Sequence, residues 1–337
     1  MEQKGFTIWS EKINDKGEDA YPTFLYSENY DRIVLAVYDG MGGAGSTMYS
    51  YLEKSYSGAY IAANEVKRIL EREYEGFIHS VNTHLVSIDS LEENIFSHLK
   101  VLADDIDKNP SRLKSGLIKR LPTTISAIIC ESDSLINQNR KLTCFWAGDS
   151  RCYILSPEDG LVQLSIDDLK GGGDALQNIK SDAPLSNYCN ADFQFILNKK
   201  VTNLQEPFIV FTATDGCFGY LPTPFHFEYL FLSSLFDHST DSFDRWSNKI
   251  TEEINKVTGD DFSMSLMSIG FNSFEEVQTR FESRFALVEN SYVKVYQQFV
   301  NAITPLEIAL ENAKDEKDQM EIKLWENYKV NYHKVYG

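Results

Sequence analysis

Short apolar runs bounded by Gly, Asp, Asn or Pro recur through most of the chain and predict strands. The runs are rich in Ile, Val, Phe and Thr, residues that favour extended structure. Most follow one another without a helix between them, which favours an antiparallel sandwich over a doubly wound parallel sheet. The predicted strands cover residues 7–12, 33–38, 124–130, 141–147, 152–155, 208–213 and 264–269.

Helical stretches are predicted in two groups between the strand runs. The first group covers residues 45–72 and 86–106, and the second covers residues 224–237 and 243–257. The run KLTCFWAGDSRCYIL, residues 141–155, has a polar centre between two apolar halves, a pattern that predicts a hairpin. The whole pattern predicts an α+β fold, in which a central β-sandwich of two antiparallel sheets is flanked by helices.

The spacing of apolar residues changes after Asn272. There they recur at steps of three and four, which predicts an amphipathic helix. The segment TPLE, residues 304–307, resembles a helix start, with a capping Thr, Pro at the first helical position and Glu three residues on. We therefore expect a domain over residues 1–272 and a helical hairpin over residues 273–337. Two interpretations of this hairpin stay open: helices that pack on the domain, or a surface for a dimer or another partner.

Composition narrows the classes of function. The net charge of −18 argues against nucleic acid or an anionic membrane as a partner. No apolar run approaches the roughly 18 residues needed to span a bilayer, and the first residues, MEQKGFTIWSEK, lack a signal-peptide core. The five cysteines form no CxxC pair, which indicates reduced thiols and argues against a zinc cluster. We expect a cytoplasmic protein.

Acidic residues follow or flank the apolar runs at five places. An apolar strand ends in Asp-Gly twice, at Asp39 in RIVLAVYDGMGGAGS and at Asp215 in FTATDGCF. A single acid at a strand end is commonly a turn or cap residue. Five together need neutralising if the strand ends converge, and Mg²⁺ or Mn²⁺ with oxygen-only ligands would do this. The other three places are GEDAY (Glu18, Asp19), FWAGDSR (Asp149) and VTGDDFSMSLM (Asp260, Asp261).

These segments resemble conserved blocks of a known enzyme family. EDA, DGMGG, TTISAII, AGDSRCYIL, TATDGCF and GDDFSMSLMSIGF come in the order seen in the metal-dependent PP2C-type (PPM) serine/threonine phosphatases. The resemblance covers about residues 5–272 and rests on order and spacing together. It implies a central β-sandwich with a dinuclear metal site at one edge.

The resemblance also implies a role for each acid. Asp39 would bridge two metals, Gly40 would join Glu18 on one of them through its carbonyl, and Asp215 and Asp260 would hold the other. Asp19 would orient the attacking water from behind the ligands. Asp149 would support the site and help to hold a third, weaker metal.

The implied activity is hydrolysis of phosphoserine or phosphothreonine in a phosphoprotein. A water bridging two divalent cations has a much lowered pKa, so hydroxide is available near neutral pH. The same cations offset the charge of the phosphoryl oxygens. No cysteine nucleophile is needed, and Cys217 is expected to be a packing residue. An opposing Ser/Thr kinase is the partner that such an enzyme implies.

Three departures from the family pattern keep alternatives open. The phosphate-binding Arg expected before Glu18 is missing, and Lys16 or Lys12 would have to replace it without an Arg fork. The glycine loop has Met41 and Ala44 where a His is common, and Asp168 stands where the family has His. The first alternative is therefore a pseudophosphatase, a module that binds phosphorylated partners without turnover. A nucleotide-binding loop at DGMGGAGS is weaker, because the Gly-Lys-Ser/Thr ending of a P-loop is absent.

Overall fold

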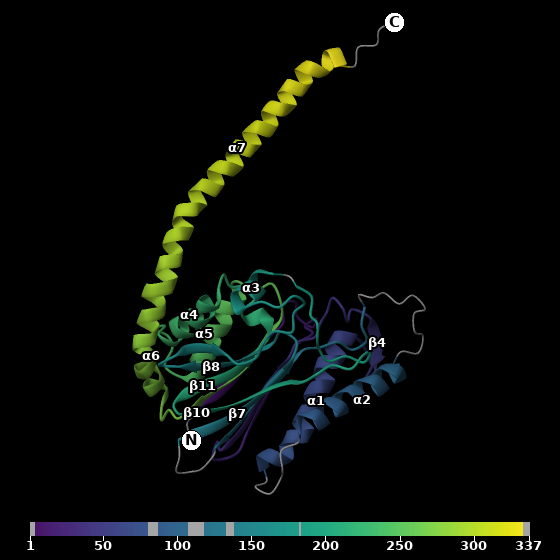
Figure 1. Ribbon diagram of the computed structural model, residues 1–337, viewed down its shortest axis with the longest axis vertical. Coiled ribbons are helices and arrows are strands. Elements are labelled where there is room, and N and C mark those ends of the chain that lie inside the picture. The colour runs from purple at the N-terminus through teal and green to yellow at the C-terminus, as the bar shows by residue number, and fades with distance from the viewer. Residues whose placement is uncertain (1–3, 80–86, 107–117, 133–137, 182, 333–337) are drawn as a thin grey trace. The chain divides into compact units, whose positions relative to one another are not determined.

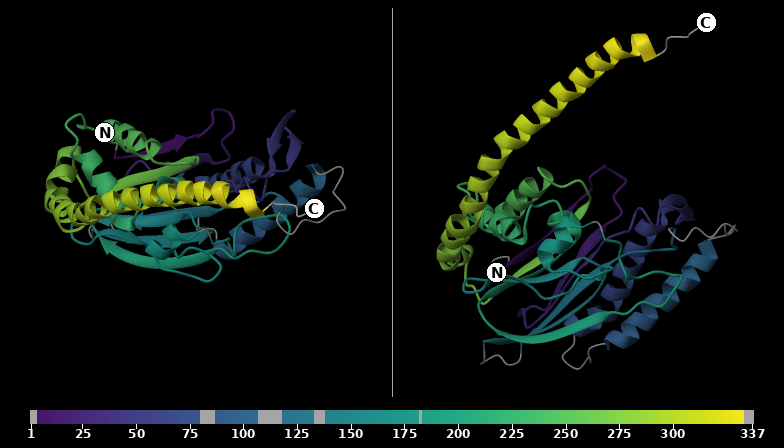
Figure 2. Two further views of the ribbon diagram at one scale, coloured as in Figure 1. Left: turned by 90° about the horizontal axis from the view of Figure 1, so that it is seen from above. Right: turned by 45° about the horizontal axis from the view of Figure 1, so that its top comes forward.

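The computed structural model describes residues 4–79, 87–106, 118–132, 138–181 and 183–332. The chain divides into a compact unit, Met1–Phe285, and a second unit, Ala286–Gly337. The compact unit contains the predicted β-sandwich with helices outside it, so the predicted fold class is confirmed (Figures 1 and 2).

Two five-stranded antiparallel sheets form the sandwich. All seven predicted strands are present, with ends shifted by a few residues, and three more strands complete the sheets. The first sheet has the order β1 (Gly5–Ser10), β12 (Phe262–Ile269), β11 (Phe208–Ala213), β8 (Arg151–Ser156) and β9 (Gly160–Gln163). The second has the order β10 (Asn198–Gln205), β7 (Asn139–Ala147), β6 (Ile125–Ser132), β3 (Arg32–Tyr38) and β2 (Ala20–Tyr26).

Both faces of the inner strands are covered, which explains their continuous apolar sequences. In β3, Leu35 packs between the sheets with Ile128 and Val210. The alternate residue Val34 faces the other way and belongs to the cluster formed with the helix residue Val66. Helices α1 (Gly58–His79) and α2 (Ile88–Ile106) cover the second sheet, whereas α4 (Pro224–Leu235) and α5 (Phe243–Asn255) cover the first (Figure 1).

The predicted hairpin over residues 141–155 is wrong. Strand β7 lies in the second sheet and β8 in the first, so the Gly-Asp-Ser-Arg segment crosses from one sheet to the other. Gly148 has a φ of +113°, a backbone conformation that suits glycine. A polar segment between two apolar runs is compatible with a hairpin or with a crossing, because both runs are buried either way.

The predicted helix over residues 45–72 is correct only from Gly58. Residues before it form a small hairpin of β4 (Met48–Tyr51) and β5 (Lys54–Ser57). Leu52 and Glu53 both have positive φ at its turn, as a two-residue turn of this kind requires. Neither is the Asn-Gly or Asp-Gly that marks such turns, so the sequence carried no signal. Helix α2 was expected from residue 86, which lies outside the described residues.

Helix α6 (Phe274–Val288) begins close to the expected boundary, but its first part belongs to the compact unit. Phe274 packs edge-on against Trp246 of α5, and Phe285 stacks on Phe236. Arg284 donates to both carboxylate oxygens of Glu228, at 2.6 and 3.0 Å. The compact unit thus ends at Phe285.

The predicted hairpin after residue 272 is also wrong, because no second helix starts at Thr304. After a π-helical segment at Glu289–Val293, α7 runs unbroken from Lys294 to Tyr332 (Figure 1). Pro305 lies inside α7 and removes one backbone donor, while the Thr304 hydroxyl donates to the Val300 carbonyl at 2.9 Å. Good helix formers continue on both sides, so the helix continues past the proline. No helix within the described residues is long and apolar enough to cross a membrane.

Candidate metal centre

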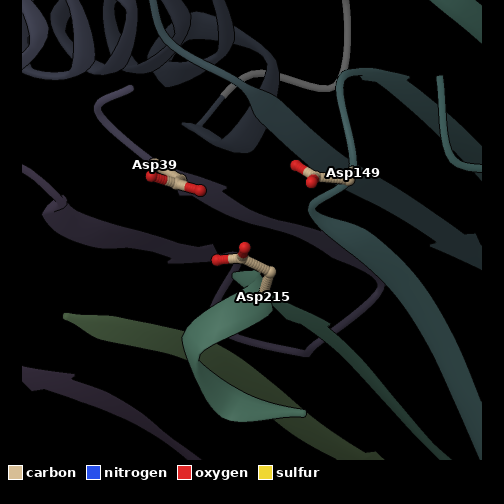
Figure 3. A group of neighbouring side chains, drawn as sticks. All are labelled: Asp39, Asp149 and Asp215. Atoms are coloured by element: carbon tan, nitrogen blue, oxygen red, sulfur yellow. The ribbon is translucent and has the colours of Figure 1, made fainter. Parts of the chain in front are cut away.

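Three strand ends meet at one edge of the sandwich and bring three carboxylates together. Asp39 follows β3, Asp149 follows β7 and Asp215 follows β11, so both sheets contribute. One carboxylate oxygen from each lies within 4.8 Å of the others. Figure 3 shows the three side chains directed into a common space. This convergence meets the condition under which the sequence pattern pointed to a cation site.

Backbone hydrogen bonds fix the two Asp-Gly turns. The Asp39 carbonyl accepts from the Thr124 N–H at 2.8 Å and from the Thr123 hydroxyl at 2.7 Å. The Asp215 carbonyl accepts from the N–H groups of Phe218 and Gly219, at 3.0 and 2.6 Å, in a 3₁₀ turn. Because the main chain is held in this way, both carboxylates project from rigid strand ends.

Glu18 is held beside the glycine loop by two contacts that the sequence did not predict. Its carboxylate accepts a hydrogen bond from the Ser57 hydroxyl, and its N–H donates to Asp261 at 2.7 Å. A Cβ at Gly40 would overlap the Glu18 backbone, and a Cβ at Gly42 would overlap the Glu18 carboxylate and displace it. Asp261 is recognisable only as the second acid of Asp-Asp, and nothing in the sequence marked Ser57.

The remaining predicted residues occupy three different settings. Asp19 is buried, and its carboxylate accepts from the Thr214 hydroxyl at 3.0 Å, next to Asp215. Asp260 lies in the loop before β12, and its carboxylate accepts from the Asp261 N–H at 2.9 Å. Lys16 is exposed in a turn, where its N–H donates to the Ile13 carbonyl at 3.0 Å.

The acids repel one another strongly in the absence of cations. Burial raises the pKa of Asp149 to about 8, with repulsion from Asp215 adding to the effect. Burial followed by repulsion from Asp260 raises the pKa of Asp215 to about 6. The pKa of Asp39 is raised well above its ordinary value by burial and then by Asp215, and that of Asp19 by the same two causes.

This donor set fits hard divalent cations. Every side chain at the cluster offers oxygen, and the raised pKa values mean that bound positive charge would relieve both burial and repulsion. Oxygen-only sites suit Mg²⁺ and Mn²⁺ rather than zinc. Asp39, Asp149 and Asp215 could hold a cation directly, and Glu18 and Asp260 are close enough to raise the local negative charge.

A pocket of about 350 Å³ adjoins the cluster, with Asp149 and Asp215 in its wall. Lys180, at the end of α3 (Ala175–Lys180), also lines it. Arg151 lies there too, but its guanidinium donates to both oxygens of Asp167, at 2.9 and 2.6 Å. Since this ion pair is buried, Arg151 is committed to the pocket wall.

Asp168 and Cys217, two further residues near the site, make structural contacts. Asp168 accepts hydrogen bonds from Gly148 and Asn187 at 3.0 and 2.8 Å and anchors the loop between the sheets. Cys217 is buried, and burial raises the pKa of its thiol well above the ordinary value. Its thiol also lies 3.4 Å from the Ser263 carbonyl, an arrangement that suits a packing residue.

Comparison with solved structures places this fold among phosphatases. The serine/threonine phosphatase Stp1 from Staphylococcus aureus matches with a TM-score of 0.55 at 15% identity, over 80% of this chain and 97% of that one. The serine/threonine phosphatase of S. agalactiae gives 0.53 at 14%, over 79% and 98%. The catalytic domain of PstP in complex with two manganese ions gives 0.51 at 13%, over 79% and 98%. The chain therefore has a PP2C-like phosphatase fold.

Comparisons at the level of sequence found no match. The chain matches no protein-family model, and no curated protein matches it.

Proposed function

We propose that this protein is a metal-dependent phosphatase that hydrolyses phosphoserine or phosphothreonine in proteins. The observation that carries the proposal is the convergence of Asp39, Asp149 and Asp215 at one edge of a PP2C-like sandwich. Three partly buried acids that face one another carry a cost in repulsion that a bound cation would relieve. The fold relatives carry the names of serine/threonine phosphatases, and one of them holds two manganese ions.

The proposed ligands are divided between two cation positions. Asp39 would contact both, with Glu18 and the Gly40 carbonyl on one side and Asp215 and Asp260 on the other. Bound Mg²⁺ or Mn²⁺ would supply an acidified water and offset the charge of the phosphoryl oxygens. Asp149 would extend the site towards a third, weakly held ion.

The protein's own groups would position the reactants. Asp19, fixed by Thr214, would orient the attacking water through its buried carboxylate. The phosphorylated side chain would enter the adjoining pocket, which the Lys180 side chain lines. Lys16 remains a proposed phosphate contact. The glycine loop has Met41 in place of a His, so the leaving oxygen would take its proton from water.

Hydrolysis of a phosphothreonine peptide tests the proposal. We expect turnover with Mn²⁺ or Mg²⁺ and none with EDTA, and a fall of about a hundred-fold or more in kcat/KM for Asp39→Asn or Asp215→Asn. Asp244→Asn, at an exposed position on α5, is the matched control and should retain activity. Metal-independent turnover, or full activity of Asp39→Asn, would contradict the dinuclear mechanism.

The second candidate is a pseudophosphatase that binds phosphorylated proteins. The missing phosphate-binding Arg supports it, because Arg151 is occupied by Asp167 and the nearby lysines lack a bidentate fork. Fluorescence polarisation with the same phosphopeptide separates the candidates. Metal-dependent binding of intact peptide without released phosphate would favour the second one.

The proposed setting follows from the activity. A phosphorylated protein is the substrate, an opposing Ser/Thr kinase is the regulatory counterpart, and the cytoplasm is the compartment. The charge of −18 opposes nucleic acid and anionic membrane as alternative partners.

A further inference from the structure

Helix α7 carries an exposed apolar stripe along most of its length. Every residue from 301 to 328 is exposed. Large apolar side chains repeat on one side at alternating steps of three and four, apart from a gap in the middle. We call this row the seam, and its apolar members are Phe299, Ile303, Leu306, Leu310, Met320 and Leu324.

The spacing of the seam is that of a heptad repeat. Ile303, Leu310 and Leu324 fall at position a, and Leu306 and Met320 at position d, over about four heptads. A repeat of 3.5 residues keeps such a row facing a partner only when two helices wind around each other. Pro305 falls at c, outside the seam.

We propose that the seam pairs with α7 of a second copy of this chain to form an antiparallel two-stranded coiled coil. Charge excludes the parallel arrangement in register. There, Lys317 at position a would stack against Lys317 of the second copy. Glu316 at position g would also meet Glu321 at position e of the second copy, once on each side of the pair.

One antiparallel alignment pairs opposite charges and separates the two Lys317 side chains, each of which lies opposite Leu306 of the second copy. With a positions facing d positions, Leu310 lies opposite Ala313 and Ile303 opposite Met320 of the second copy. Glu307 then meets Lys314 of the second copy, and symmetry makes this pair occur twice. A shift of one heptad in either direction would instead place Glu307 opposite itself or opposite Glu321. Among pairings of two copies of α7, the charge pattern thus favours this antiparallel alignment.

This inference is independent of the chemistry at the acidic cluster, because all of its residues lie on α7. The first test is the mass of the full chain by analytical ultracentrifugation, for which we expect twice 38.5 kDa. Leu310→Glu places a charge in the seam and should raise the dimer dissociation constant by at least about a hundred-fold. Ile308→Glu is the matched control, because Ile308 is 58% exposed against 57% for Leu310 but falls at f, outside the seam.

Charge reversal tests the orientation. Glu307→Lys and Lys314→Glu should each raise the dissociation constant about five- to thirty-fold, and the double variant should restore it. In a parallel pair both residues would face Ala302 or Ala309, so neither reversal would matter. A monomeric wild type, a dimer that survives Leu310→Glu, or a double variant without recovery would each overturn the proposal. Binding of another protein by a monomeric chain would do so as well.

Discussion

Metal-free protein should become less stable as the pH rises, and Asp149→Asn should remove much of that loss. The pKa of Asp149 is about 8 in the folded protein against an ordinary value of 3.8. The folded state therefore binds more protons than the unfolded state between these values, and stability falls as the pH rises through that window. Asparagine keeps the shape of the side chain and has no charge to bury.

The magnitude follows from the size of the window. One pH unit is worth about 1.36 kcal/mol per proton, so the penalty between pH 5 and pH 8 reaches about 4 kcal/mol at most. The full penalty is not expected for one residue, because the repulsion is divided among Asp39, Asp149 and Asp215. Solvent also reaches the pocket beside these carboxylates and screens their charges. We therefore expect Asp149→Asn to gain about 2 kcal/mol on the wild type between pH 5 and pH 8.

Urea denaturation in EDTA measures this difference without screening the charges. The buried Trp146 and Trp246 give a fluorescence signal from the compact unit. Asp244→Asn is the control, and its difference from the wild type should stay constant with pH. The reasoning fails if the gap between Asp149→Asn and the wild type does not widen from pH 5 to pH 8. Saturating Mn²⁺ should narrow the stability difference between Asp149→Asn and the wild type. The wild type keeps all of the carboxylates, so bound cations relieve more repulsion in it than in the variant.

Two other predictions concern Glu18 and the end of the compact unit. Gly42→Ala should displace Glu18, and Ser57→Ala should remove one of the contacts that hold it. Each variant should weaken Mn²⁺ binding by about ten-fold or more in calorimetry. Gly43→Ala is the control and should bind Mn²⁺ normally, because a Cβ there meets open space. Equal affinity in Gly42→Ala and Gly43→Ala would remove Glu18 from the site. Phe281→Ala should destabilise the protein by about 3–5 kcal/mol in thermal unfolding, since the ring is fully buried in α6, and a loss below about 1 kcal/mol would mean that α6 is not part of the core.

Periodicity predicted the strands that are buried on both faces, but of the four edge strands it found only β1 and missed β2, β9 and β10. Strands such as β3 and β11 read as unbroken apolar runs because helices and the opposite sheet cover them. The edge strand β10, with the sequence NKKVTNLQ, is polar at six of its eight positions, and β2 contains a proline. Both lie at sheet edges, where burial imposes little pattern on the sequence. Tertiary position, which the sequence does not display, decides whether such segments become strands.

The acids of the candidate site could be predicted for a different reason. Two buried strands end in Asp-Gly, and acids follow or flank apolar runs at five places in one chain, which pointed to a shared site. Contacts that hold these acids carried no comparable signal. Asp167 and Ser57 act through partners that are distant in sequence, Arg151 and Glu18, so only the folded chain reveals them.

Two local predictions in the sandwich were wrong, the hairpin over residues 141–155 and the helix start near residue 45. Both segments contact or contain residues of the candidate site. If residues 141–155 had formed a hairpin within one sheet, Asp149 would lie at the turn of that hairpin. It would then be away from the edge of the sandwich where the two sheets meet. The crossing at Gly148 instead carries Asp149 to the edge that Asp39 and Asp215 share. Likewise, the hairpin β4–β5 delays the start of α1 until Gly58. The hydroxyl of Ser57, just before the helix, accepts from the Tyr60 N–H and donates to Glu18. At both segments the local sequence pattern pointed to another structure, and the structure that forms positions Asp149 and Glu18.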